Sequence, residues 1–249
     1  MKKVIFKVLL LLVSIGSFAQ ERIITPLNDH YYPLSQGGGE HVFNRVESKS
    51  SDGYMIYRIF TLDNILIKVN RSSYLQVDGE LVHFEEEKSY NSSGALNFVR
   101  LDFKSSKSTQ VKILVDEDVV SEIQCVNQND CSGFLVLPDG EELAIDRDIF
   151  KPSFTDAGVF DVWLSKVLTY PIVSRRLGVQ GDVWVGAEID ENGDLIQFKI
   201  MNKNEVHDSL IDEVNRVLRK YKDGFIPAKN LKGEAIQAWM YFPVKFRLG

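Results

Sequence analysis

The strongest constraint on the fold is a series of short, strand-like runs in the middle of the chain. Each run is rich in β-branched and aromatic residues, and turn clusters such as DGE, NSSG and PDGEE separate them. Short strands at this spacing, with no helical period between them, are typical of an antiparallel sheet of sandwich or meander type. The runs are YMIYRIF (54–60), NILIKVN (64–70), ALNFVRLDF (95–103), TQVKILVD (109–116), VVSEIQC (119–125) and SGFLVLP (132–138). We therefore predict an antiparallel β-rich domain over residues 54–150.

The chain ahead of these runs shows no sustained period. Residues 20–53 contain the stretches PLNDHYYPLSQGGGE and VESKSSDG, which are rich in proline, glycine and serine. We predict an irregular lead with room for one short strand. After the β-rich domain, RDIFKPSFTDAG (147–158) breaks the strand pattern with a proline and a glycine and is the predicted domain boundary.

Beyond this boundary the hydrophobic period lengthens to that of a helix. Apolar residues from Phe160 to Leu168 recur at intervals of three and four. This spacing predicts a helix that Asp156 caps and that ends before Pro171. Residues 181–200 then alternate as a strand, a turn and a second strand.

A second helix and a last strand complete the C-terminal module. Apolar residues between 209 and 222 share one helical face, and alternate residues of 236–246 lie on one side of a strand. The order helix, strand, strand, helix, strand predicts a compact two-layer α+β module over residues 157–249. The predicted fold class is therefore α+β, with an N-terminal antiparallel β-rich domain followed by this module.

The N-terminus, MKKVIFKVLLLLVSIGSFAQ, has the pattern of a secretory signal peptide. Basic residues precede an apolar run, and small residues stand near its end, which predicts a signal peptide over residues 1–19 with cleavage between Ala19 and Gln20. A retained membrane anchor is the alternative. A spanning helix needs about 20 apolar residues, however, and Lys7 and Ser14 leave a shorter run. We therefore expect an exported chain.

The two cysteines, Cys125 and Cys131, lie close together in CVNQNDC. An exported chain meets an oxidising environment, and two cysteines on either side of a polar turn can meet across the end of a hairpin. The alternative is a zinc site, but two thiols without a matching His or Cys pair supply only half of the ligands. We predict a structural disulfide.

The stretch GVQGDVWVGAEIDENGDL (178–195) is where a phosphate loop or a calcium loop could lie. Its glycines precede a strand rather than a helix, and no GK[ST] follows, which argues against a phosphate loop. An EF-hand loop needs glycine at its sixth position and glutamate at its twelfth, whereas here glycine falls fourth and Met201 stands twelfth. We predict instead a hairpin turn at Asn192-Gly193.

No other pattern in the sequence nominates a catalytic, cofactor or metal site. The four histidines are scattered, none in an HExxH spacing, and no serine lies in a G-x-S-x-G motif. The net charge of −6 is unlike that of a protein that neutralises phosphates. We therefore predict a protein that is not an enzyme, holds no cofactor or metal and binds no nucleic acid.

Several short motifs follow one another along residues 157–249. They are Tyr170-Pro171, Gly178 to Gly181 ahead of a V-x-V strand, Asp190 to Gly193, the helix at Leu210, Phe225 to Ala228 with Gly233 beyond, and Phe242 to Phe246. With these motifs the module resembles the TonB C-terminal domain, as found in Bacteroidetes-type proteins. The β-rich domain resembles no family that we recognise.

The resemblance implies a periplasmic protein-interaction module that supports transmembrane transport. Such domains bind the N-terminal segment of an outer-membrane, TonB-dependent transporter as an added strand, and inner-membrane motor proteins supply the force. Because Pro243 lacks an amide hydrogen, the last strand is best tolerated at a sheet edge. The candidate docking residues precede it: Gln237, Ala238, Trp239, Met240 and Tyr241. Alternatively, these residues pair within the domain or across a homodimer.

This chain departs from the usual transducer of the family. Such a transducer keeps an N-terminal helix in the inner membrane and joins it to the domain through a long Pro-rich spacer. Here the signal looks cleavable and a β-rich domain takes the place of the spacer. A soluble periplasmic protein is therefore our main hypothesis. The alternatives are an anchored, TonB-type energy transducer and a protein whose β-rich domain binds a small ligand or glycan.

Overall fold

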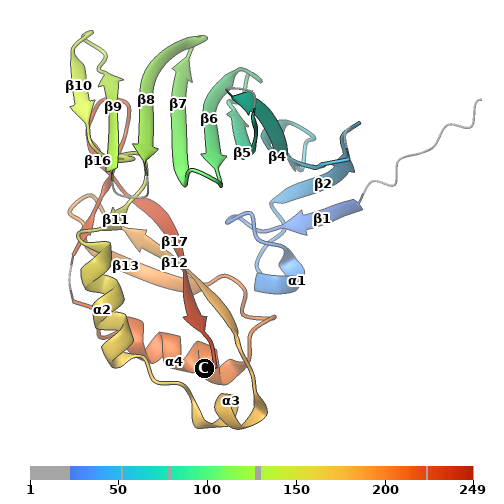
Figure 1. Ribbon diagram of the computed structural model, residues 1–249, viewed down its shortest axis with the longest axis vertical. Helices are drawn as coiled ribbons and strands as arrows, with labels where there is room; N and C mark the ends of the chain where they lie inside the picture. Colours follow the sequence, from blue (N-terminus) through green and yellow to red (C-terminus); the bar gives the residue numbers. More distant parts are fainter. Residues whose placement is uncertain (1–22, 52, 78–79, 127–129, 223, 249) are drawn as a thin grey trace, which may run out of the picture.

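The computed structural model describes residues 23–51, 53–77, 80–126, 130–222 and 224–248 (Figure 1). The described chain is α+β, with many strands and few helices. The predicted signal peptide over residues 1–19, with Ala19 and Gln20 at its cleavage site, lies outside these residues. Within them, every helix is too short or too polar to cross a lipid bilayer.

The N-terminal part of the chain is a ten-stranded sheet in which each strand pairs with the next along the sequence (Figure 1). All of these pairs are antiparallel. The sheet is therefore a meander. Its strands are β1 (Ile23–Leu27), β2 (Phe43–Lys49), β3 (Met55–Thr61), β4 (Leu66–Val77), β5 (Glu80–Tyr90), β6 (Leu96–Phe103), β7 (Ser108–Val115), β8 (Asp118–Val126), β9 (Asp130–Val136) and β10 (Glu142–Ile145).

The segment predicted as an irregular lead, residues 20–53, contains two strands of this sheet. β1 pairs with β2, and β2 pairs with β3 along its whole length. A four-residue helix, α1 (Leu34–Gly37), connects β1 and β2. The strands were missed because polar residues hide their period. Arg45 and Glu47 of β2, for example, form an ion pair with each other at 2.8 Å.

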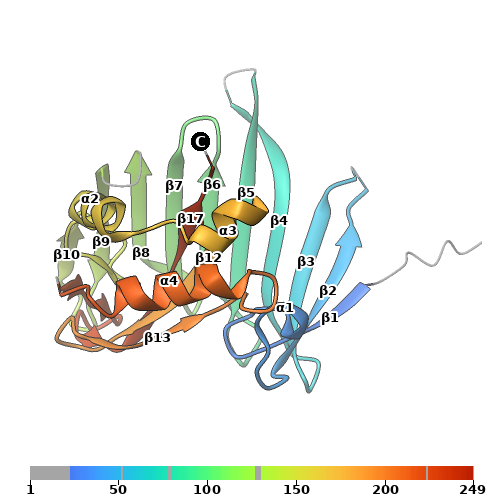
Figure 2. The same cartoon turned by 90° about the horizontal axis from the view of Figure 1, so that it is seen from below.

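The C-terminal module is built on a three-stranded antiparallel sheet with the strand order β13-β12-β17. Its middle strand is β12 (Gly181–Ile189), and β13 (Leu195–Ile200) and β17 (Ala238–Phe246) flank it. Helix α4 (Asp208–Leu218) lies across one face of this sheet (Figure 2). The two helices and three longer strands follow the predicted order, with a short helix, α3 (Ile172–Leu177), added after Pro171 and three two-residue strands added between α4 and β17.

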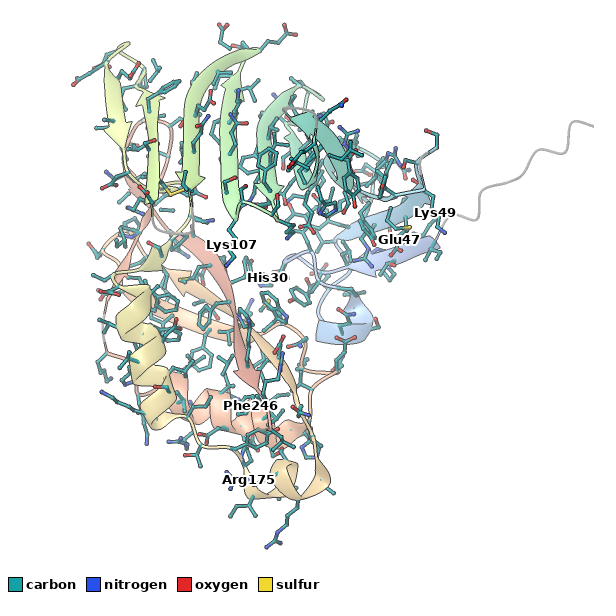
Figure 3. The ribbon with its side chains drawn as sticks, viewed as in Figure 1. His30, Glu47, Lys49, Lys107, Arg175 and Phe246 are labelled. Atoms are coloured by element: carbon teal, nitrogen blue, oxygen red, sulfur yellow. A yellow bond between two sulfur atoms is a disulfide. The ribbon has the colours of Figure 1, made fainter. Side chains whose placement is uncertain are left out.

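The core of this module lies between the sheet and α4. Val183, Val185 and Val244 of the sheet pack against Leu210 and Val214 of the helix, and all five side chains are almost fully buried. Phe246 closes one end of this core (Figure 3). Its ring meets that of Tyr170 edge-on at 5.6 Å between centroids.

Helix α2 (Ala157–Val167) begins where the sequence predicts it. The Asp156 carboxylate accepts a hydrogen bond from the Val159 amide at 3.1 Å, which satisfies one of the free amides at the helix start. Phe160 is the buried residue of this helix, and its ring stacks on that of Phe154 at 4.0 Å. Phe154 belongs to the two-residue strand β11 (Ser153–Phe154), which pairs with β14 (Phe225–Ile226).

The turn between β12 and β13 is the hairpin that the sequence predicts. The Asp190 carboxylate accepts hydrogen bonds from the amides of Asn192 and Asp194 at 2.9 and 2.8 Å. Gly193 has a φ of 85°, and a Cβ there would lie 2.2 Å from the Phe225 carbonyl oxygen. Glycine is therefore required at position 193 both for the turn and for the close approach of β14.

The ten-stranded sheet packs on the C-terminal module at its β9–β10 end. Val111, Ile123, Leu135 and Ile145 form a buried cluster there, against which Leu231 of the module packs. Leu231 lies in the hairpin between β15 (Ala228–Lys229) and β16 (Ala235–Ile236). A backbone hydrogen bond of 2.6 Å from the Lys229 amide to the Ile149 carbonyl reinforces this contact.

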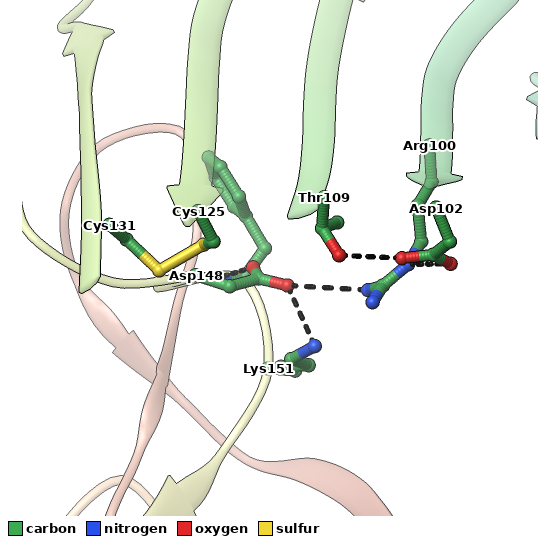
Figure 4. The surroundings of a disulfide bond; sticks show 8 residues. Arg100, Asp102, Thr109, Cys125, Cys131, Asp148 and Lys151 are labelled. Carbon is green, nitrogen blue, oxygen red and sulfur yellow. Dashed lines mark hydrogen bonds and ion pairs between the residues drawn. A yellow bond between two sulfur atoms is a disulfide. The ribbon is translucent and has the colours of Figure 1, made fainter. Parts of the chain in front are cut away.

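The segment that joins the two parts is held to the sheet by a group of charged side chains (Figure 4). Asp148, in this segment, accepts from Lys151 at 3.0 Å and lies 3.9 Å from the Arg100 guanidinium of β6. Arg100 in turn pairs with Asp102 at 2.8 Å, and the Thr109 hydroxyl donates to Asp102 at 2.6 Å. The predicted boundary is thus a tethered connection rather than a free linker.

The predicted disulfide is present next to this group. Cys125 of β8 and Cys131 of β9 lie directly opposite each other in the ladder and are bonded, with a sequence separation of six. Both side chains also contact the buried cluster at this end of the sheet. The disulfide therefore stabilises the part of the sheet on which the C-terminal module rests.

We expect the double variant Cys125→Ser/Cys131→Ser to lose about 2 kcal/mol of unfolding free energy, because the cross-link no longer restricts the unfolded chain. Urea denaturation followed by circular dichroism measures this loss. Unmodified protein kept in excess reductant is the matched control and should fall to the same stability. An unchanged midpoint in the double variant would contradict this prediction.

Candidate partner-binding edge

Strand β17 is an edge strand of the three-stranded sheet. In the described part of the chain it pairs with β12 on one side and with no strand on the other. An edge strand presents a row of unpaired amides and carbonyls, to which another extended chain can add. The geometry of this row decides which of the predicted docking residues can take part.

The hydrogen bonds of Trp184 in β12 show which way the backbone groups point. The Trp184 carbonyl accepts from the Met201 amide at 2.8 Å, and the Trp184 amide donates to the Asn202 side chain at 2.9 Å. Both groups thus point away from β17. Because Trp184 faces Pro243 in the β12–β17 ladder, these two residues are a pair without mutual hydrogen bonds. The backbone nitrogen of Pro243 therefore lies on the free edge.

Because the backbone amides of successive residues point to opposite edges of a strand, the predicted docking residues divide into an outward and an inward set. The amides of Trp239 and Tyr241, two and four positions before Pro243, also point to the free edge. Those of Ala238 and Met240 point inward to β12, and the Met240 side chain is buried under the sheet. Gln237 precedes the strand, and its amide side chain donates to Glu188 at 2.7 Å.

The side chains of Trp239 and Tyr241 lie on the outer face of the sheet, by which we mean the face opposite α4. Their rings stack on each other at 6.4 Å between centroids. Gly186 of β12 makes room for them, since a Cβ there would lie 3.1 Å from Tyr241 Cε1 and 3.2 Å from Trp239 Cε3. An aromatic surface therefore lies directly beside the free edge.

His30, from the loop after β1, packs on this aromatic surface (Figure 3). Its ring meets Trp239 edge-on at 4.5 Å between centroids, and its Nδ1 lies 2.9 Å from the Tyr241 hydroxyl. The Lys199 ammonium of β13 lies 3.3 Å from His30 Nε2 and 5.0 Å from the centre of the Trp239 ring. The N-terminal sheet thus reaches the outer face through a single loop.

Charged neighbours of both signs act on the protonation state of His30. Because Lys199 can only donate, a hydrogen bond from it requires Nε2 to accept and Nδ1 to donate to Tyr241, whereas the Asp29 carboxylate, 3.6 Å from Nε2, favours a hydrogen on Nε2. Burial and the nearby Lys199 charge lower the pKa of His30, although Asp29 and Glu188 act in the opposite direction. Burial, together with Asp29 and neighbouring tyrosines, raises the pKa of Tyr241 to about 12. Both side chains are therefore neutral at pH 7.

Sequence reasoning found the edge strand but missed what surrounds it. His30 was one of four scattered histidines, and its partners lie about two hundred positions away in the chain. Gly186 carried a usable signal, because a glycine inside a strand often marks a close approach of other groups. Among the described residues, no group of His, Cys, Asp and Glu side chains is arranged to hold a metal ion.

Comparison with known proteins gives one match. Residues 166–248 match the protein family described as "Gram-negative bacterial TonB protein C-terminal". This range runs from the end of α2 to the end of the chain and contains the whole three-stranded sheet, including β17. No curated protein and no solved structure matches the chain.

The protonation state of His30 predicts a pH effect on stability. Because the folded pKa of His30 is below its ordinary value of about 6.5, the unfolded chain binds the proton more readily. The neutral His30 ring therefore contributes fully to the free energy of unfolding above pH 6.5, and this contribution is lost as pH falls through the folded pKa. When the pH is lowered from 7.5 to 5, we expect the free energy of unfolding to fall less in the His30→Gln variant than in the unmodified protein.

Urea midpoints at the two pH values measure this difference. His83→Gln, on the distant β4–β5 hairpin, is the control and should follow the unmodified protein. If the free energy of unfolding falls equally between the two pH values in the His30→Gln and His83→Gln variants, the His30 contacts do not resist protonation.

Proposed function

Residues 166–248 form a TonB C-terminal domain, and we propose that the protein uses the free edge of β17 in this domain to bind outer-membrane transporter segments in the periplasm. A domain of this family is a non-catalytic protein-interaction module that takes part in coupling energy to transport. In our proposal the partner is the N-terminal segment of a TonB-dependent transporter. It adds to β17 as a further antiparallel or parallel strand.

The observation that carries this proposal is the outward direction of the Trp239 and Tyr241 amides on an edge without a partner strand. Main-chain hydrogen bonds to these amides and to the carbonyls beside them provide affinity for many sequences. Pro243 offers no amide at the next outward position. It limits the hydrogen-bonded part of the added strand to residues 237–241 and so helps to set its register.

The aromatic surface beside the edge supports the same proposal. Side chains of an added strand that point to the outer face would lie next to Trp239 and Tyr241. Large, rigid aromatic side chains are typical anchors of protein interfaces. Because His30 holds both rings in place, the surface is largely formed before a partner arrives.

We propose that this binding takes place in the periplasm, because the sequence predicts an export signal. We propose a soluble periplasmic protein with a ten-stranded sheet fused to the interaction domain, and inner-membrane motor proteins as further partners. The alternative is an anchored energy transducer. The observation that would favour it is an N-terminal segment that stays in the membrane, which cell fractionation detects.

Proline substitutions test the strand-addition proposal, because proline removes a single backbone donor. We expect Trp239→Pro and Tyr241→Pro to weaken the binding of transporter N-terminal peptides at least tenfold, which corresponds to about one lost hydrogen bond. Trp239→Phe and Tyr241→Phe are the matched controls, since they keep the amides and an aromatic ring. Fluorescence anisotropy with labelled peptides measures the affinity.

Two outcomes would count against this proposal. One is unchanged peptide affinity in both proline variants while thermal melts show a native fold. The other is an equal loss in the phenylalanine controls, which would assign the effect to side chains rather than to the amides. Ala238→Pro serves as a reference for damage to the fold, since its amide faces β12.

Cell fractionation with N-terminal sequencing tests the proposed location. We expect the mature protein in the periplasmic fraction with Gln20 as its first residue, because a signal peptidase reads the small residues before the cleavage site. An abundant cytoplasmic protein and a known inner-membrane protein are the fractionation controls. Recovery of the chain with Met1 intact in the inner membrane would overturn the soluble proposal and support the anchored alternative.

A further inference from the structure

A cavity of about 480 Å³ lies where the segment after β1 meets the end of β13 and helix α4. This volume falls within the range of about 300–1,000 Å³ that is usual for small-molecule sites. β13 and β17 are opposite edges of the three-stranded sheet. The cavity lies on the β13 side of the sheet and is walled by both parts of the chain, and two of its lining residues, His30 and Lys199, also contact the side chains of Trp239 and Tyr241.

One wall of the cavity is the glycine run that follows α1. Gly37 touches the end of β13 so closely that a Cβ would lie 2.2 Å from the Met201 carbonyl oxygen. Gly38 and Gly39 have φ values of 68° and 103°, which glycine adopts without strain. The Asn28 side chain donates to the Gly38 carbonyl at 3.0 Å and holds the run in this shape.

Hydrogen bonds also attach this wall to the C-terminal module. The Asn204 amide donates to the Gln36 carbonyl at 2.8 Å, and its side chain donates to the Ser35 carbonyl at 3.2 Å. The wall therefore does not depend on a ligand for its position. A cavity that is already formed loses little free energy to ordering when a ligand binds.

Apolar side chains form the inner lining of the cavity. Ile200 is the last residue of β13, Met201 follows it, and Ile211 comes from α4. Met201 is almost fully buried, so its side chain is fixed by its neighbours. This lining suits the apolar part of a small molecule.

Two lysines that also line the cavity give it a positive charge. Lys199 contacts the neutral His30 ring and the Trp239 face, and Glu188 is near enough to be influenced by its charge. The Lys203 stem lies against Gly38, with its Cε 3.4 Å from where a Cβ would be, and its ammonium has no ion-pair partner among the described residues. Asp29 is the one acidic residue of the lining.

We propose that this cavity binds a small carboxylate with an apolar body. The carboxylate pairs with Lys199 and Lys203, and the apolar body lies against Ile200, Met201 and Ile211. A carboxylate gains charge-assisted hydrogen bonds from the two ammonium groups. A cation would be repelled by the same groups. A neutral apolar molecule would leave Lys203 without a partner.

Such binding would connect the two parts of the protein. The ligand would bridge the wall after β1 to the C-terminal module, and it would change the surroundings of Trp239 through Lys199. The site goes beyond the proposed strand addition, because it needs neither the free edge of β17 nor a protein partner. Its test measures the binding of the small molecule itself, although Lys199 is shared with the aromatic surface beside that edge.

Calorimetric titration of the mature, full-length protein with sodium octanoate tests the proposal. We expect one molecule to bind per chain, and we expect Lys199→Gln/Lys203→Gln to weaken binding at least tenfold, as the loss of charge-assisted hydrogen bonds predicts. Lys104→Gln/Lys107→Gln is the matched control, because it removes the same charge from the β6–β7 turn. This control variant should bind octanoate like the unmodified protein.

Two related molecules separate the contributions of charge and apolar body. We expect 1-octanol and inorganic phosphate each to bind at least tenfold more weakly than octanoate, since each offers only half of the recognised features. The proposal is overturned if octanoate does not bind at millimolar concentrations, if octanol binds as tightly, or if the Lys199→Gln/Lys203→Gln variant keeps its affinity. Thermal melts of the variants confirm that a loss of binding is not a loss of fold.

Discussion

The pairing of β17 with β12 alone is the constraint on which the candidate site depends. The backbone of β12 is hydrogen-bonded on both sides, to β13 and to β17, and its apolar residues pack on α4. Since no other strand of the described chain continues this sheet, the outward amides of β17 are left free. Pro243 fits this position because its missing donor falls on the free edge, where it interrupts no hydrogen bond of the sheet.

The ten-stranded sheet and the C-terminal module are held together at two places. Apolar packing around Leu135 and Leu231 joins them at one end, with the disulfide and the Asp148 ion pairs beside it. At the other end, the loop and helix after β1 pack on the outer face and on the end of β13. The second group of contacts holds the segment after β1 against the C-terminal module and forms the walls of the cavity.

Sequence patterns predicted those features whose causes are local. The Asn192-Gly193 turn, the Asp156 cap and the strand runs from residue 54 onward depend on residues close together in the chain, and the structure contains all of them. The strands β1 and β2 were missed because their residues are stabilised by neighbouring strands rather than by an apolar period of their own. His30 was missed for the same reason, since its contacts belong to residues of a different sheet.

By itself, the sequence determined the fold class, the disulfide partners and the TonB-type motifs, because backbone preferences, close spacing and ordered motifs are properties of short stretches. Only the tertiary structure decided which amides of residues 237–241 face outward, since that depends on the register between β12 and β17. It also decided the placement of His30, Lys199 and the glycines at 37–39 around one junction. Such placement arises from packing between distant segments, which no local pattern specifies.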